Sequence, residues 1–409
     1  MSWTPLLTGE VADLARRTCR DLAGGLDELA GDSTPIGLHQ GLAGVALALR
    51  YVGEGLGDDE MIRRSEDRVE RAVERSSEQG PDSASLATGF VGVAWTLDHL
   101  AELDALPADE DPNADTDEIL WRALPPADLP ADVRERLDFD LFRGLVGLGV
   151  YALQRGHRPR ALPILERVVE LLRLTGRPEG ADRTGWYTPA WLLPPDAAAM
   201  YPEGYYNLGL AHGTPCVIAF LARALAPLAA RQEVDDLLGR AVRWILARRL
   251  PRPESPYFPG IEARGHEPNQ SLVSWCYGDL GVGTAVLSAG RRAGRPEWTD
   301  AALEVLRSAA RRRRGASDFV RDCCLCHGTA GNGHVFARCF HATGEGVFAD
   351  AARYWFRAAL GSLAPPTCPT GKCGGCVRCL EGVVFGSTSR KGAALMVETL
   401  KGLEAGKIT

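Results

Sequence analysis

The sequence predicts an all-α protein, an α/α toroid in which seven inner helices alternate with seven outer helices. Two observations predict this fold: a short glycine-rich element recurs along the 409 residues, and an amphipathic segment precedes most of its copies. The copies begin at intervals of 48 to 69 residues, which is long enough for two helices and their loops. Their first glycines are Gly41, Gly89, Gly144, Gly213, Gly278, Gly328 and Gly382. A closed ring of such pairs would leave no terminal repeat exposed.

The stretches after the glycines are expected to be the inner helices. They are mostly apolar and rich in Gly and Ala, which is typical of helices buried on most sides. The glycines themselves permit positive φ angles and let the backbone approach another segment closely. The seven copies cover residues 39–49, 87–97, 142–153, 211–221, 276–287, 326–336 and 380–390.

Charged segments with apolar residues at helical spacing are expected to be the outer helices, each with one face in water. The first covers about residues 9–30. The third, within 115–137, has the weakest pattern. The others include "MIRRSEDRVERAVERSSEQ" (61–79), "ALPILERVVELLRL" (161–174), "EVDDLLGRAVRWILARRL" (233–250), "WTDAALEVLRSAARRRRG" (298–315) and "FADAARYWFRAALGSLA" (348–364).

Two irregular insertions are expected within a single domain of residues 1–409. Residues 104–138 are acidic and rich in proline, and residues 175–207 carry aromatic and turn residues without a helical period. Long ordered loops in compact domains often serve function.

The composition limits the class of protein. It is 45% hydrophobic and 24% charged, as in globular proteins, and the formal net charge of −7 does not favour nucleic-acid binding. The first residues lack an apolar core of signal-peptide length, and no segment has the roughly 18 apolar residues of a membrane span. A cytoplasmic protein is therefore expected, in which the eleven cysteines are thiols or metal ligands rather than a disulfide framework.

If the glycine-rich elements meet at one rim, the polar side chains on them meet there too. Cys276, Cys326 and His327 would then offer two thiolates and one imidazole, a ligand set that suits Zn²⁺ and leaves a fourth position open, as in catalytic zinc sites. Cys326 and His327 would diverge by about 100° on a regular helix, whereas on a turn both can face one ion. The alternative is structural, because a lone buried cysteine is usually a small hydrophobe.

His212 occupies the equivalent place in the fourth element and is a candidate proton donor or acceptor beside the metal. Asp140, four residues before Gly144, could orient it. A hydrogen-bonded histidine at a helix start and an aspartate that caps a helix are the alternatives. The cluster Cys368, Cys373, Cys376 and Cys379 fits either a second zinc site or a thiol-rich loop.

With "NLGLAHGTPC" (207–216), "SWCYGDLGVG" (274–283) and "LCHGTAGNG" (325–333) in this order, the chain resembles the LanC family, the lanthionine-forming cyclases of lantibiotic biosynthesis. The resemblance covers nearly the whole length and implies a stand-alone cyclase that binds one Zn²⁺. It assigns the zinc ligands to Cys276, Cys326 and His327, the acid/base pair to His212 and Asp140, and a further site residue to Tyr277.

The reaction that the resemblance implies is an intramolecular Michael addition. A cysteine thiol of a dehydrated precursor peptide would lose its proton at the zinc and attack a dehydroalanine or dehydrobutyrine of the same peptide. The enolate formed would then take a proton from His212. The expected partners are the precursor peptide, a dehydratase and a transporter, in a complex that places the protein at the membrane periphery, with no nucleic acid.

Two positions depart from the family pattern. Leu272 stands where members commonly have an arginine, and Cys216 stands where a glycine is usual. Two other functions stay open: a non-catalytic zinc-thiolate binding protein, and a thiol alkylator of the protein prenyltransferase type, whose ligand set contains a carboxylate. The presence of His212 and Asp140 beside the zinc set favours the cyclase, because binding alone requires no proton donor.

Overall fold

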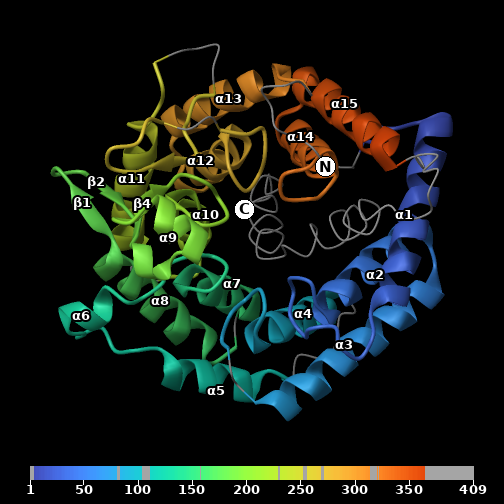
Figure 1. Cartoon of the computed structure of the whole chain (residues 1–409), viewed down its shortest axis with the longest axis horizontal. Helices are drawn as coiled ribbons and strands as arrows, with labels where there is room; N and C mark the ends of the chain where they lie inside the picture. Colours follow the sequence, from blue (N-terminus) through green and yellow to red (C-terminus); the bar gives the residue numbers. More distant parts are fainter. Residues whose placement is uncertain are drawn as a thin grey trace. The chain divides into compact units, whose positions relative to one another are not determined.

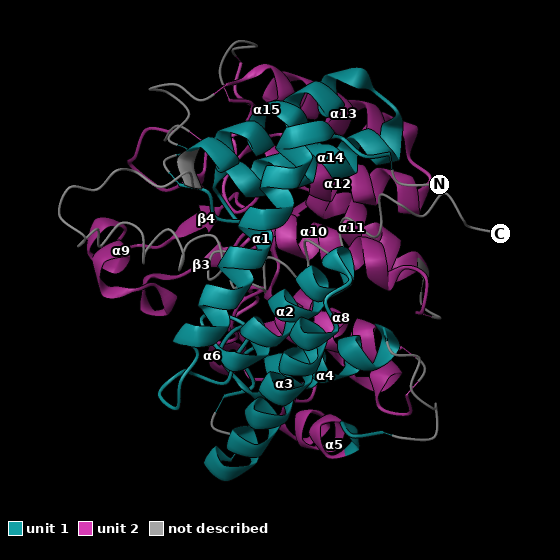
Figure 2. Cartoon of the chain, turned by 90° about the vertical axis from the view of Figure 1, so that its right-hand side faces the viewer, with its two compact units in different colours: residues 1–114, 320–393 teal, residues 115–319, 394–409 magenta. Residues whose placement is uncertain are grey.

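The structure is a computed structural model that describes residues 4–80, 83–103, 111–156, 158–228, 231–251, 256–268, 271–313, 320 and 322–363. Within these residues it contains fifteen α-helices, one short 3₁₀ helix and five strands of two or three residues. The chain divides into two compact units, shown in Figure 2. Unit 1 comprises residues 1–114 and 320–393, and unit 2 comprises residues 115–319 and 394–409. The single domain expected from the sequence stays a prediction.

The described part of unit 1 consists of α-helices and the loops that join them, without strands. Its α2 packs against α1, α3 and α4, α14 packs against α15, and α1 also contacts α15 (Figure 1). The bounds are α1 Gly9–Leu29, α2 Leu42–Leu56, α3 Asp59–Gln79, α4 Phe90–Leu103, α14 Thr329–Thr343 and α15 Gly346–Leu363.

Helix α3 shows why the outer helices form as they do. Its only buried residues, Met61, Ser65, Val69 and Ala72, recur every three or four positions and make one narrow stripe, as expected of an amphipathic helix. Asp58 caps its N-terminus by accepting a hydrogen bond from the amide of Met61 at 3.1 Å.

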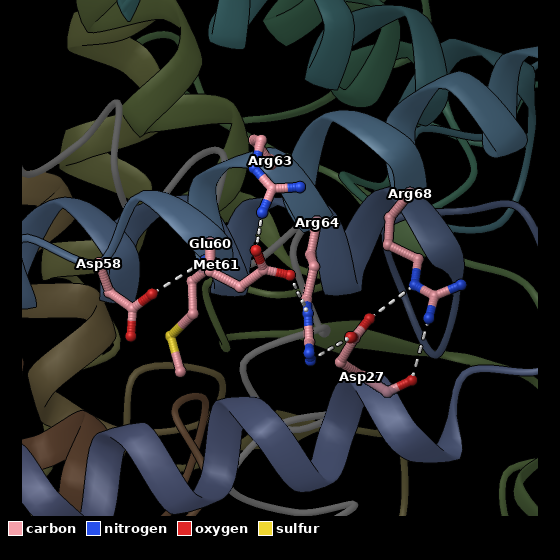
Figure 3. A network of polar contacts seen from close by, with 7 residues as sticks. All are labelled: Asp27, Asp58, Glu60, Met61, Arg63, Arg64 and Arg68. Carbon is pink, nitrogen blue, oxygen red and sulfur yellow. Dashed lines mark hydrogen bonds and ion pairs between the residues drawn. The ribbon is translucent and has the colours of Figure 1, made fainter.

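Ion pairs join α3 to α1 along the same side (Figure 3). Asp27 of α1, which is almost fully buried, accepts from Arg64 at 3.1 Å and from Arg68 at 2.6 Å. Because one buried carboxylate receives two guanidinium groups from successive turns of α3, the register between the two helices is well determined.

Unit 2 contains nine helices in its described residues, and two small sheets. The inner helices α7, α10 and α12 pack on one another in this order, and each also packs on the outer helix that follows it. The bounds are α5 Ala114–Ala123, α6 Ala131–Arg134, α7 Leu145–Arg155, α8 Ala161–Thr175, α9 Pro195–Met200, α10 Thr214–Ala224, α11 Arg231–Leu246, α12 Asp279–Ala293 and α13 Pro296–Arg311.

The sheets lie largely in the second expected insertion. Strands β1 (Arg177–Glu179) and β2 (Arg183–Gly185) form an antiparallel hairpin. Strands β3 (Tyr187–Thr188), β4 (Tyr205–Asn207) and β5 (Ile261–Glu262) form an antiparallel sheet in the order β3-β4-β5. The 3₁₀ helix Ala190–Leu192 and α9 lie between β3 and β4.

The expected alternation of helices is present wherever the structure describes it. Six glycine-rich elements lead into α2, α4, α7, α10, α12 and α14, and the outer helices are α1, α3, α5, α8, α11, α13 and α15. In α12, every residue from Asp279 to Gly290 is buried, as expected of an inner helix. The seventh element, 380–390, lies outside the described residues. The first insertion is less irregular than expected, since it holds α5, the weak third outer helix, and α6.

The glycines that begin the inner helices are required mainly by close backbone approach. A Cβ atom on Gly144 would lie 2.0 Å from the carbonyl oxygen of Asp138, and one on Gly213 would lie 2.0 Å from that of Asn207. Neither residue has a positive φ. Gly278 differs, because its φ of 137° is also one that L side chains rarely adopt.

The segment from six residues before such a glycine up to the glycine itself forms a repeated turn, which we call the capping turn. The amide that follows the glycine donates to the carbonyl of the first residue of the turn, for example Leu145 to Asp138 at 2.9 Å and Thr329 to Asp322 at 3.0 Å. The side chain of that first residue accepts from the amide two positions later, which is an Asx or ST turn. This bond occurs at Ser83 (3.3 Å), Asp138 (3.0 Å), Asn207 (2.8 Å) and Asp322 (3.0 Å).

Candidate metal and proton-transfer site

His212 and Asp140 form a pair in unit 2. Both lie on capping turns, and Nδ1 of His212 bonds Oδ2 of Asp140. The other oxygen of Asp140 accepts from the amide of Arg143 at 2.7 Å, so both oxygens of the buried carboxylate are hydrogen-bonded. Its alternative role as the cap of α7 is not observed, because the N-cap is Gly144. The arrangement directs Nδ1 of a partly exposed imidazole to the carboxylate and leaves Nε2 as the nitrogen that can exchange a proton with a ligand.

A second carboxylate, Asp138, lies beside this pair. It begins the capping turn of α7 and accepts from the amide of Asp140 at 3.0 Å. Burial, and next the charge of Asp140, raise the pKa of Asp138 above its usual value. Arg143 lies 3.5 Å from it and offsets part of this effect. The expected proton-transfer pair therefore has a second carboxylate beside it, whose charge Arg143 partly offsets.

Cys276 and Tyr277 lie on the capping turn of α12, which contacts the turn that carries His212. The amide of Ala211 donates to the carbonyl of Cys276 at 3.3 Å, and a Cβ on Gly209 would lie only 2.3 Å from that oxygen. The rings of His212 and Tyr277 are 6.2 Å apart. Unit 2 by itself thus brings together all four of its expected site residues.

Tyr277 is held by a buried amide. Nδ2 of Asn207 donates to its phenolic oxygen at 3.2 Å, while Oδ1 of Asn207 holds the amide of Gly209. Burial raises the pKa of Tyr277 well above its usual value. The phenol is therefore neutral at physiological pH and keeps a proton that it can donate in a hydrogen bond.

Cys326 and His327 lie in unit 1, on the capping turn of α14 rather than in the helix. Sγ of Cys326 is 2.8 Å from Nδ1 of His327, so the two donor atoms converge as expected of neighbours on a turn. Nε2 of His327 bonds Oδ2 of Asp322 at 3.0 Å. The hydrogen bonds with Asp322, and next with Cys326, raise the pKa of His327 to about 10.

Asp322 and Cys324 are further candidate site residues, which the sequence motifs did not indicate. Donor atoms of Asp322, Cys324 and His327 lie within 4.8 Å of one another, a carboxylate-containing group that the sequence did not indicate. Burial raises the pKa of Asp322, but the hydrogen bonds from His327 and from the amide of Cys324 outweigh burial and leave the pKa below its usual value. The hydrogen bond with Cys326, and next burial, raise the pKa of Cys324.

The signal that could have found Asp322 is its place in the repeat. It is the first residue of its capping turn, as Asp138 and Asn207 are of theirs. Polar residues that recur six positions before the glycines mark the side chains that bond within these turns.

The donor chemistry of this part of unit 1 suits zinc. A thiol and an imidazole converge, and a carboxylate binds the other nitrogen of the imidazole, as in carboxylate–histidine–zinc arrangements. Cys276 belongs to unit 2. Its place beside Cys326 and His327 in one ligand set stays a prediction from the sequence.

Both residues that depart from the family pattern, Leu272 and Cys216, lie in described parts of unit 2. Leu272 begins the capping turn of α12 and pairs through its backbone with Gly278. Cys216 is fully buried in α10, where burial raises its pKa well above the usual value, so it behaves as a small core residue.

The cluster Cys368, Cys373, Cys376 and Cys379 lies outside the described residues. None of the helices that the structure describes is long and apolar enough to cross a membrane.

Comparisons with known proteins agree with this architecture. Residues 32–356 match the family described as lanthionine synthetase C-like protein. The nisin biosynthesis protein NisC of Lactococcus lactis subsp. lactis is 24% identical over 318 residues, which are 72% of this chain and 71% of that protein. A solved structure of nisin cyclase superposes with a TM-score of 0.70 at 19% identity, over 95% of this chain and 99% of that one. This likeness confirms the predicted fold class, an all-α toroid.

Proposed function

This chain belongs to the lanthionine synthetase C-like family, a family of lanthionine cyclases, and from that premise we propose that it closes thioether rings on a dehydrated precursor peptide in lantibiotic biosynthesis. A cysteine thiol of the peptide would add to a dehydroalanine or dehydrobutyrine of the same peptide and yield lanthionine or methyllanthionine. The relative named as a nisin biosynthesis protein supports a peptide substrate of this class.

The proposal assigns one zinc ion to Cys276, Cys326 and His327. When bound there, zinc supplies a Lewis acid that lowers the pKa of a thiol from about 8.5, so that a thiolate exists at neutral pH. The convergence of Cys326 and His327 in unit 1 supports the two ligands that lie there.

The protein's own residues would complete the addition. As the sulfur–carbon bond forms at the β-carbon, the double bond of the dehydro residue becomes an enolate, and His212 would deliver a proton from Nε2 to the α-carbon. Asp140 would hold the opposite nitrogen and stabilise the protonated ring. The proton lost by the thiol balances the proton gained by the carbon, so the mass of the peptide does not change.

Tyr277 would stabilise the enolate. It is neutral, its oxygen is held by Asn207, and its ring lies near that of His212. A phenolic O–H directed at a developing oxyanion is a common way of stabilising such charge.

The observation that carries the proposal is the hydrogen bond between Ala211 and Cys276. It joins the turn that bears the proton-transfer histidine to the turn that bears an expected zinc ligand. A binding protein would need the ligand but not the histidine–carboxylate pair.

The decisive experiment incubates the zinc-loaded protein with a dehydrated precursor and counts free thiols by alkylation and mass spectrometry. Thiols should disappear faster than in enzyme-free buffer. Cys276→Ala should lower both zinc content and activity, whereas His212→Asn should keep the zinc and lose activity. If the protein binds zinc and peptide but thiols persist, it is a zinc-thiolate binding protein; if His212→Asn loses the metal, the ligand assignment is wrong.

The wider setting is also part of the proposal. We infer that the chain works as a single domain beside a separate dehydratase and a transporter, in a complex at the inner face of the membrane. Copurification of the full chain with these partners, from cells that express all of them, would test this setting.

A further inference from the structure

We infer that Asp322 is a positioning residue that sets the tautomer of His327, so that Nδ1 is the nitrogen that binds the metal. The inference rests on the proposed zinc site and adds to it a residue that lies outside the sequence motifs. It concerns only residues of unit 1.

The two ring nitrogens of His327 face different partners. Nε2 lies 3.0 Å from Oδ2 of Asp322, and Nδ1 lies 2.8 Å from Sγ of Cys326. A ring that binds a metal keeps only one proton, and an ionised carboxylate can only accept, so in the metal-bound form that proton resides on Nε2. The lone pair of Nδ1 is then directed to the side on which the sulfur of Cys326 lies, as two ligands of one ion require.

Comparison of the capping turns shows that the turn does not require the contact between Asp322 and His327. The turn itself uses only one side-chain oxygen, and at Ser83 a single hydroxyl accepts from the amide two positions later. Asn207 and Asp322 also use their first oxygen in this way, and the second polar atom of each bonds the side chain of an expected site residue. Asn207 binds Tyr277 and Asp322 binds His327.

Asn207 also shows that asparagine is compatible with this turn. Its Oδ1 accepts from the amide of Gly209 at 2.8 Å, and Oδ1 of Asp322 accepts from that of Cys324 at 3.0 Å. Asp322→Asn can therefore keep the backbone bond while its amide group replaces the oxygen that faces His327. An N–H facing Nε2 would favour the tautomer with its proton on Nδ1, which blocks the nitrogen assigned to the metal.

The test is the zinc affinity of the full chain, measured by competition with a chromophoric chelator. Asp322→Asn should weaken zinc binding by about 10- to 100-fold while one zinc still binds at saturation. Asp138→Asn is the matched control, because it makes the same substitution at the same position of another capping turn. Its zinc affinity should equal that of the wild type, and both metal-free variants should stay folded by circular dichroism.

The outcomes separate this inference from the proposed function. If the wild type binds no zinc, the proposed zinc site fails and the inference fails with it. If the wild type binds zinc and Asp322→Asn binds it equally well, only the inference is overturned.

A variant of Cys324 tests the rival arrangement in which Asp322 and Cys324 are themselves ligands. With Co²⁺ in place of zinc, the thiolate charge-transfer band of Cys324→Ser should match that of the wild type, and Asp322→Asn should keep the same band. A weaker band in Cys324→Ser together with a complete loss of metal in Asp322→Asn would overturn the positioning role.

Discussion

The backbone amide of Ala211 donates a hydrogen bond to the carbonyl of Cys276 at 3.3 Å. Two turns that are remote in sequence are thereby held in contact, and His212 on one comes to lie near Tyr277 on the other. The proposed proton donor His212, Tyr277 and the expected zinc ligand Cys276 therefore lie on two turns of unit 2 that a backbone hydrogen bond joins.

Gly209→Ala should separate these two turns. The added Cβ would lie 2.3 Å from the carbonyl oxygen of Cys276, which is backbone and cannot move aside cheaply. Overpacking of this kind costs about 1–3 kcal/mol, so the free energy of unfolding should fall by that amount in urea titrations, and ring formation should slow.

Gly55→Ala is the control for this prediction. Gly55 lies in α2, and a Cβ there would meet nothing within 4 Å. The substitution should raise stability by about 0.4–1 kcal/mol because it restricts the unfolded chain. If both substitutions lowered the free energy of unfolding equally, the close approach of Gly209 to Cys276 would not be the cause of the loss.

Asp140→Asn should slow catalysis without loss of metal. The amide would donate to Nδ1 of His212 in place of the carboxylate and favour the wrong tautomer, so the rate of ring closure at saturating peptide should fall by about 10²- to 10⁴-fold. Zinc content, measured by atomic absorption, should not change. Asp182→Asn removes an exposed carboxylate from the same unit and should react at the rate of the wild type. A wild-type rate in Asp140→Asn would exclude the orienting role.

Asp138→Asn should make the protein more stable at neutral pH. Burial and Asp140 raise the pKa of Asp138 in the folded state, so the folded state binds more protons than the unfolded state in the window above the usual aspartate value of about 3.9. The free energy of unfolding therefore falls as pH rises through that window, and asparagine avoids this loss. At pH 7 the urea midpoint of the variant should be higher than that of the wild type, and the difference between the two midpoints should shrink toward pH 4. A gap that is constant with pH would contradict the assignment.

Arg155→Met should strongly destabilise unit 2. Nη2 of Arg155 lies 2.7 Å from Oδ2 of Asp117, and both side chains are almost fully buried. Removing the guanidinium leaves a buried carboxylate, which costs about 3–5 kcal/mol. The double variant Asp117→Leu with Arg155→Met removes both charges and should unfold at higher urea concentration than the single variant. A double variant less stable than the single one would show that the buried charge is not the cause.

The helical pattern could be predicted because its signals are local. Gly144 and Gly213 are read directly from the sequence, and apolar residues at helical spacing, such as the stripe from Met61 to Ala72, identify the outer helices. The sheets could not be predicted, because strands of two or three residues such as β3 and β4 are too short to show an alternating pattern.

The sequence by itself determined the succession of glycine turns and helices, and through motifs near Cys276, Cys326 and His212 it determined the family and the candidate site residues. Only the tertiary structure decided which polar atoms meet. Nothing local in the sequence says that the second oxygen of Asp322 bonds His327, or that Asn207 holds Tyr277. Such pairs depend on how a turn directs each side-chain atom, and a hydrogen bond tolerates errors of only a few tenths of an ångström, so they are decided by packing rather than by pattern.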